Sequence, residues 1–167
     1  MSHLFFKPLL AASITGAAFV TGCQISLSYV SLASILGPKD LDEKRALGQF
    51  RSVFDRGFHL CPLPAIASGL CCFANAALVT MGRRSDGSTA TRLIASGLLM
   101  IGLVPYTLIF ILPTEEWLLK REKNANSGLR SDTEEKKTWV LLRRWGQLNY
   151  IRAIFPLAGM VLAWTLV

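Results

Sequence analysis

The sequence has few charged residues and long stretches with none at all. Of its 167 residues, 51% are hydrophobic and only 17% are charged. No Asp, Glu, Lys or Arg occurs between Pro8 and Gly37, from Gly57 to Gly82, or from Leu93 to Leu112. Uncharged apolar runs of roughly 18 residues or more are typical of membrane-spanning helices, because backbone groups in lipid must be paired within the segment. This pattern excludes a soluble globular enzyme and a nucleic-acid-binding domain.

Motifs for metal, phosphate and nucleophile chemistry are also missing. The two histidines, His3 and His59, are far apart and outside any ligand-spaced cluster, so no zinc or di-iron site is predicted. The four cysteines all fall in apolar stretches, and no Cys-x-x-Cys occurs, which disfavours a membrane thiol oxidoreductase. There is no glycine-rich phosphate loop, no Gly-x-Ser-x-Gly and no internal repeat. We therefore expect no metal and no bound cofactor.

The apolar stretches predict an all-α integral membrane four-helix bundle. The first three spans are expected at about 9–36, 57–81 and 93–112. The last apolar stretch, 153–167, would be about 22 Å long as a helix, shorter than the roughly 30 Å hydrocarbon core. Its helix must therefore begin upstream, near Gln147 to Asn149, giving a fourth span at 147–166. The whole chain, 1–167, is then one transmembrane domain with loops at 37–56 and 113–146.

The basic residues predict the orientation of these spans. Thirteen Lys and Arg lie in the two long loops, and four lie on the other side, namely Lys7, Arg83, Arg84 and Arg92. Since cytosolic loops carry an excess of Lys and Arg, both long loops are expected in the cytosol. In a eukaryote the membrane would be that of the endoplasmic reticulum. The net charge of +7 is thus mainly a topology signal, with contact to membrane lipids as a second role.

Polar side chains share a face in the first helix and flank the start of the second. Gln24, Ser28 and Ser31 follow an i, i+4, i+7 spacing, so they lie on one helical face. Such residues either hydrogen-bond between packed membrane helices or contact a ligand. His59 is expected at the cytosolic end of the second span, beside Asp55 and Arg56. It is either an interfacial residue or a proton-transfer group.

The third span ends in Pro113, Thr114 and Glu115. Proline followed by threonine is typical of a helix that stops and restarts, with Thr114 as the N-cap of the next helix. Glu115 would then be favoured by the helix dipole. The structural interpretation of these residues is local helix capping. The alternative is a place in a ligand site.

The start of the fourth span carries the sharpest group of residues. Trp145, Asn149 and Arg152 are spaced i, i+4, i+7 and lie on one face. A charge inside a membrane span is costly unless it is paired, so Arg152 is a candidate functional residue. Its alternative is to reach back to the nearby interface. Together with the groups above, these side chains meet at the cytosolic end of the bundle, as a pocket for a flat hydrophobic ligand requires.

At these residues the sequence resembles the anthrone oxygenase family. The segment from Trp145 to Arg152 is similar to the Trp-x-x-x-Asn-x-x-Arg signature that opens the family's last helix. Pro113-Thr114 resembles its Pro-Thr-Asn element after the third helix, except that Glu115 stands where the family has Asn. The segments 16–35 and 54–70 resemble its first helix and the start of its second. The resemblance covers most of the chain in order.

The resemblance implies a small membrane oxygenase of secondary metabolism that converts an anthrone-type aromatic polyketide to an anthraquinone with O2. Other enzymes of the same pathway are possible partners. From the chemistry we expect Arg152, oriented by Asn149, to hold an oxyanion and His59 or Glu115 to take a proton. Trp145, Gln24, Ser28, Ser31 and Thr114 are the expected substrate contacts. The competing hypothesis is a non-enzymatic four-helix scaffold or lipid-binding protein.

Overall fold

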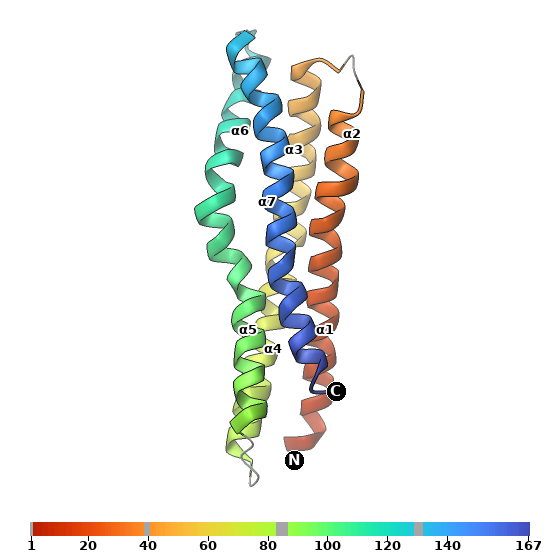
Figure 1. Cartoon of the computed structure of the whole chain (residues 1–167), viewed down its shortest axis with the longest axis vertical. Coiled ribbons are helices and arrows are strands. Elements are labelled where there is room, and N and C mark those ends of the chain that lie inside the picture. Colours follow the sequence, from red (N-terminus) through yellow and green to blue (C-terminus); the bar gives the residue numbers. More distant parts are fainter. Residues whose placement is uncertain (1, 39–40, 83–86, 129–131) are drawn as a thin grey trace.

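The structure is an elongated bundle of four long antiparallel helices (Figure 1). This computed structural model describes residues 2–38, 41–82, 87–128 and 132–167, and the regular structure within them is entirely helical. α1 begins and α7 ends at one end of the bundle, whereas α2 ends and α3 begins at the other (Figure 1). Two five-residue π-helical turns, η1 and η2, interrupt otherwise continuous helices. In chain order the elements are α1 (Ser2–Ser26), η1 (Leu27–Ser31), α2 (Leu32–Leu36), α3 (Glu43–Leu60), α4 (Pro62–Met81), α5 (Gly87–Tyr106), η2 (Thr107–Ile111), α6 (Leu112–Asn126) and α7 (Asp132–Trp164).

The half of the bundle nearer the termini is built from α1, α4, α5 and the C-terminal part of α7. α1 and α5 each pack against both α4 and α7. Glycines allow the closest approach, because a Cβ atom added to Gly97 would lie 3.0 Å from the carbonyl oxygen of Gly69. Small residues of this kind let membrane helices approach backbone to backbone. This half therefore has the packing expected of a membrane bundle.

Large apolar side chains cover the outside of the same half. Within the described residues, three continuous helices are long and apolar enough to cross a membrane, and they run over Phe5–Leu36, Glu43–Met81 and Gly87–Asn126. This result is consistent with a membrane protein and confirms three of the expected spanning helices. The apolar part of α7 contains Gln147, Asn149 and Arg152, which lower its hydropathy below that of the other three helices. The expected span at 147–166 stays a prediction.

The two segments expected as connections between the spans, 37–56 and 113–146, are largely helical. Most of segment 37–56 lies in α3, and α6 and the beginning of α7 account for most of segment 113–146. The fourth helix begins at Asp132, well before the expected start near Gln147. The reason is amphipathic packing: α3 buries Leu47 and Phe50 against Leu118 of α6 and Leu142 of α7. Lys39, Arg83, Arg84 and Arg130, which contributed to the predicted orientation, lie outside the described residues.

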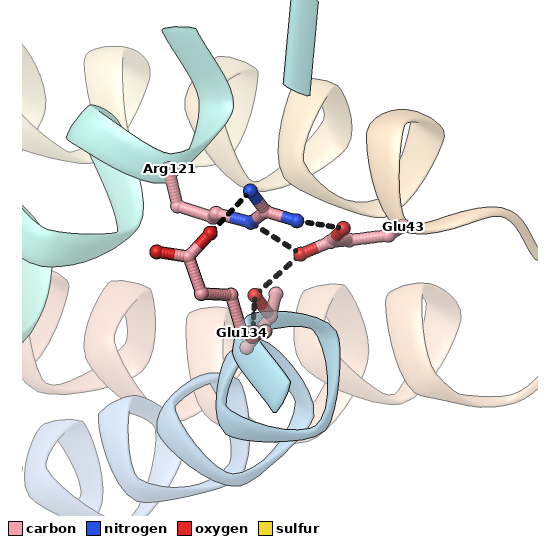
Figure 2. A network of polar contacts seen from close by, with 4 residues as sticks. Glu43, Arg121 and Glu134 are labelled. Atoms are coloured by element: carbon pink, nitrogen blue, oxygen red, sulfur yellow. Dashed lines mark hydrogen bonds and ion pairs between the residues drawn. The ribbon is translucent and has the colours of Figure 1, made fainter. Parts of the chain in front are cut away.

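The half of the bundle farther from the termini, called the second half below, is built from α2, α3, α6 and the beginning of α7. It contains a network of charged groups (Figure 2). The Arg121 guanidinium of α6, only 2% exposed, donates from Nε and Nη2 to both carboxylate oxygens of Glu43, at 2.9 and 2.8 Å. Its Nη1 donates to Glu134 of α7 at 2.8 Å. The Thr138 hydroxyl donates to Glu43 at 2.6 Å. The network joins α3, α6 and α7 through charge-assisted hydrogen bonds.

Pro113 does not end the third helix, so the expected N-cap role of Thr114 is wrong. The chain passes directly from η2 into α6, and Pro113 occupies the first turn of α6. Proline lacks a backbone N–H and its ring clashes with the carbonyl four residues before it. The wider π-helical turn at Thr107–Ile111 removes that conflict without breaking the helix.

Candidate active site

A cavity of about 210 Å³ lies where the two halves of the bundle meet. Its polar and charged lining side chains are Thr107, Glu115, Trp145 and Arg152. Three irregular points of the backbone meet there, because η1 contributes Leu27, η2 contributes Thr107 and Leu108, and the α3–α4 junction contributes Gly57 and Pro62. π-helical turns occur frequently at functional sites. The remaining lining side chains are apolar, namely Val53, Phe54, Phe58, Leu103 and Val104.

Trp145, Asn149 and Arg152 lie in a row along α7, as their spacing predicts, and Asn149 bonds to the backbone of the first and the side chain of the last. Asn149 is fully buried and donates from Nδ2 to the carbonyl oxygen of Trp145 at 2.9 Å. Its Oδ1 accepts a short hydrogen bond from Nη2 of Arg152. A buried acceptor in this position fixes the direction of the guanidinium group. Asn149 does not line the cavity itself, so it acts on the site through Arg152.

Arg152 faces the cavity and has an N–H donor that no neighbouring group among the described residues accepts. Its Nη1 donates to Oγ1 of Thr107 at 3.3 Å, and its Nε is buried without a partner. Both recorded acceptors, Asn149 and Thr107, are neutral groups. The guanidinium therefore keeps a positive charge that neighbouring side chains do not fully satisfy, and it can interact with an anionic atom of a ligand.

Glu115 is the second charged group of the cavity. It is buried, and its Oε1 accepts a hydrogen bond of 2.9 Å from the indole Nε1 of Trp145. Glu115 and Arg152 are close enough to interact electrostatically. The Trp145 ring is itself held by an edge contact with Phe50, at 5.1 Å between ring centroids. A carboxylate and a guanidinium thus share one apolar cavity.

The sequence interpretation missed Thr107 and the apolar wall formed by α3. Thr107 is one of few polar residues in the third apolar stretch, which was the only signal for it. Phe54 and Phe58 lie in a segment expected to be partly loop, so their shared face was not considered. The spacing of residues 54 and 58 on a helix places both rings on the cavity side.

His59 is not brought to the cavity. Its side chain is exposed on α3, and its ring contacts Phe58 edge-on at 5.7 Å between centroids. Among the residues that line the cavity, Glu115 is the one carboxylate and no histidine is present. Of the two candidate proton acceptors, the geometry therefore favours Glu115.

The polar face of the first helix serves mainly in packing. The Ser28 hydroxyl donates to the carbonyl oxygen of Gly146 on α7 at 2.9 Å, which is the interhelical contact expected of such a residue. Gln24 is fully buried and neither atom of its amide group has a partner, but it does not line the cavity. Ser31 lines a separate groove between the first helix and α3.

Thr114 also lies away from the cavity. It is buried beside a third groove between α6 and α7, with Trp117, Lys137 and Arg144. Lys137 stacks over the Trp117 ring at 4.8 Å.

The structure thus gathers Arg152, Glu115 and Trp145 in one cavity, with Asn149 directly behind. The other five candidates, His59, Gln24, Ser28, Ser31 and Thr114, are outside it.

The described residues contain no group of three or more His, Cys, Asp or Glu side chains that could hold a metal ion. What the cavity offers is an acceptor for a proton, a donor for an anion, and apolar walls. An apolar enclosure strengthens the effect of both charged groups on a bound ligand. This arrangement suits removal of a proton from a carbon acid, with the resulting negative charge placed on an oxygen near Arg152.

Comparison with known proteins gives a consistent picture. The family described as anthrone oxygenase matches residues 50–162. Anthrone oxygenase tpcL of Aspergillus fumigatus is 28% identical over 151 residues, covering 90% of this chain and 87% of that protein. Monooxygenase hypC of Dothistroma septosporum is 30% identical over 145 residues, covering 86% and 74%. Noranthrone monooxygenase of Aspergillus flavus is 26% identical over 151 residues, covering 90% and 69%. No solved structure gives a significant match.

Proposed function

Because the chain belongs to the anthrone oxygenase family, we propose that it oxidises an anthrone-type aromatic polyketide to an anthraquinone in secondary metabolite biosynthesis. The relatives named anthrone oxygenase, monooxygenase and noranthrone monooxygenase support this activity. The observation that carries the site assignment is that Glu115 and Arg152 line one apolar cavity with Trp145. An aromatic tricyclic ketone fits such a site because its faces are apolar and its oxygen is at one edge.

The proposed reaction consumes one O2 and releases one water. The central methylene of an anthrone loses a proton, and the electron pair moves to the ketone oxygen, giving an aromatic phenolate. This electron-rich anion reduces O2, and a new carbon–oxygen bond forms at the former methylene carbon. The resulting peroxide anion takes up one proton to give a hydroperoxide. The hydroperoxide then loses the remaining C–H proton while its O–O bond breaks, and the hydroxide released takes up that proton, leaving a carbonyl group and one water. No further reductant is required, so we propose a reaction without a cofactor.

We assign the first proton transfer to Glu115. Its carboxylate is buried in the cavity wall, and the Trp145 N–H holds one oxygen while the other can accept a proton. Burial among apolar side chains favours the neutral acid, so the carboxylate is readily protonated. By the resemblance given above, Glu115 takes the place expected for an Asn of the family element, so we propose this role for this chain alone.

We assign the developing oxyanion to Arg152. A donor that faces a growing negative charge in an apolar site lowers the barrier strongly, because it is already oriented when the charge appears. Asn149 and Thr107 provide that orientation through the hydrogen bonds to Nη2 and Nη1. Asn149 is therefore a positioning residue, whereas Arg152 touches the substrate.

The experiment compares Glu115→Gln and Glu115→Asn with Glu116→Gln in membranes. Glu116 is the exposed neighbour on the same turn, so its variant controls for the loss of one charge. We expect both Glu115 variants to lose most anthrone oxidation above the spontaneous background and Glu116→Gln to keep it. If Glu115→Asn oxidises the anthrone at the wild-type rate, Glu115 is not the base. If the wild-type protein does not exceed the background, the proposed activity itself fails.

We also propose a multi-pass protein of the endoplasmic reticulum membrane with segments 37–56 and 113–146 on the cytosolic side. The excess of Lys and Arg in these segments supports this orientation. A cytosolic position would bring the second half of the bundle to other enzymes of the pathway. Protease protection of an epitope inserted at Gly128 in sealed microsomes tests the orientation.

A further inference from the structure

The cavity has one side on which its lining reaches the outer surface. Of all its lining residues, only Phe58 of α3 and Leu108 of η2 are exposed, with relative solvent accessibilities of 63% and 58%. The others are buried or half-buried. The cavity therefore opens sideways, between α3 and η2, and not along the axis of the bundle.

Both axial directions are filled with side chains. Toward the second half of the bundle, Phe50, Leu118 and Leu142 are fully buried and pack with Trp145 in one core cluster. Toward the termini, Val20, Ala65 and Leu103 form another buried cluster. A flat tricyclic ligand could not pass either of these buried clusters without unfolding a layer of the core, because protein cores are close-packed.

The opening lies in the apolar outer surface. After Phe58 the exposed side chains along the chain are His59, Leu60 and Leu63, and Leu108 is followed by exposed Ile109 and Phe110. Large exposed apolar areas of this kind face lipid in a membrane protein. An opening bordered by such side chains faces acyl chains.

We propose that the aromatic substrate reaches the cavity directly from the lipid bilayer, through an opening between α3 and η2 that Phe58 and Leu108 border. The nature of the ligand rests on the proposed function, but the route rests on exposure and packing alone. Since anthrones and anthraquinones partition into lipid, the bilayer supplies the substrate and receives the product. The two border residues then control the rate of passage while the buried groups determine binding.

The test measures binding kinetics of a hydroxylated anthraquinone, which is not turned over, to the protein in lipid nanodiscs. Leu108→Trp and Phe58→Trp narrow the opening from opposite elements. Ile109→Trp is the matched control, because Ile109 is the next residue, is 64% exposed, and lines a different groove. Circular dichroism and size exclusion establish that each variant is folded.

For a narrowed opening we expect the association and dissociation rate constants to fall several-fold together, with little change in Kd. The Ile109 variant should bind at the wild-type rates. Wild-type kinetics in both Leu108→Trp and Phe58→Trp would overturn the proposal, as would equal slowing by Ile109→Trp. Because only binding is measured, a wild-type protein that binds but does not oxidise an anthrone contradicts the proposed function and leaves the route standing.

The lipid contact is tested separately by photocrosslinking. With p-benzoylphenylalanine in place of Phe58, irradiation in nanodiscs is expected to give a phospholipid adduct detectable by mass spectrometry. The same substitution at the fully buried Phe50 should give only crosslinks within the protein. Absence of a lipid adduct at position 58 would mean that the opening does not face the bilayer.

Discussion

The indole N–H of Trp145 donates to Glu115 at 2.9 Å and thereby connects α7 to α6 across the cavity wall. This single bond determines which Glu115 oxygen is free to face a ligand. It also places the tryptophan ring, which packs against Phe50, between the carboxylate and the core of the second half of the bundle. The geometry of the candidate site thus depends on a hydrogen bond between two consecutive helices, α6 and α7.

Replacing Trp145 with phenylalanine should separate this bond from the packing of the ring. Trp145→Phe keeps an aromatic ring beside Phe50 but removes the donor, and a hydrogen bond to a charged group contributes about 1.5–3 kcal/mol. We expect kcat for anthrone oxidation to fall by roughly tenfold or more, since about 1.4 kcal/mol corresponds to a factor of ten.

The control for this change is Trp139→Phe, on the same helix and outside the cavity lining. It should retain wild-type kcat. Equal losses in the two variants would show that aromatic packing of α7, and not the Glu115 bond, supports activity.

Arg152 should be intolerant of substitution even by lysine. The guanidinium bonds Asn149 and Thr107 through different nitrogens, and a lysine ammonium cannot reproduce that fork. Removing one donor to an oxyanion typically costs about 10² to 10³ in kcat. We expect Arg152→Gln to lose roughly that factor and Arg152→Lys to recover little of it. Steady-state kinetics measure kcat for these variants, with Arg144→Gln as the exposed control. Near wild-type kcat in Arg152→Lys would show that the two-pronged hydrogen bonding of the guanidinium is not required.

Asn149→Ala distinguishes a positioning role from a structural one. Without its Oδ1, Arg152 loses the acceptor that orients it, but the cavity lining stays the same. We expect kcat to fall while Kd for an anthraquinone changes little. A matched fall in thermal stability with unchanged kcat per folded protein would instead assign Asn149 to packing.

Much of this arrangement could be predicted from the sequence, because two strong physical signals were present. Uncharged apolar runs predicted the helices, and the i, i+4, i+7 spacing predicted that Trp145, Asn149 and Arg152 share a face. The row of hydrogen bonds along α7 is the direct consequence of that spacing.

Prediction from the sequence was least accurate for the regions whose structure depends on tertiary packing or on irregular backbone. Segment 37–56 was expected only as a connection between spans, with no prediction of a helix, and α3 is helical there because Leu47 and Phe50 pack into a buried core. The effect of Pro113 was misjudged, because a π-helical turn before it was not expected. Thr107 reaches Arg152 from another helix, a contact that no local spacing could reveal.

The Arg121 network should contribute strongly to stability. Arg121→Met removes the cation that pairs with the buried carboxylate of Glu43, and breaking such a buried pair costs about 3–5 kcal/mol. We expect a large fall in the free energy of unfolding in detergent. The double variant Arg121→Met with Glu43→Leu should recover part of it, because no buried charge is then left uncompensated. Arg51→Ala, which breaks a half-exposed pair with Asp55, should cost no more than about 1 kcal/mol.

The close packing of α5 against α4 predicts that alanine lowers the stability of the protein at Gly97, whereas alanine should raise it at Gly48 of α3. A Cβ atom at position 97 would lie 2.5 Å from the Phe73 ring and 3.0 Å from the backbone oxygen of Gly69. The ring can turn, but the backbone oxygen can move only with its helix. Gly97→Ala should therefore destabilise the bundle by about 1–3 kcal/mol, as overpacking does.

Gly48 is the matched control, since a Cβ atom there meets nothing within 4 Å and the residue lies inside α3. Alanine is favoured over glycine in a helix by roughly 0.5–1 kcal/mol, so Gly48→Ala should stabilise the protein. Thermal unfolding of both variants in the same detergent measures the difference. If Gly97→Ala is as stable as Gly48→Ala, α4 and α5 are not in backbone contact, and the half of the bundle that supports Arg152 is packed more loosely than the structure shows.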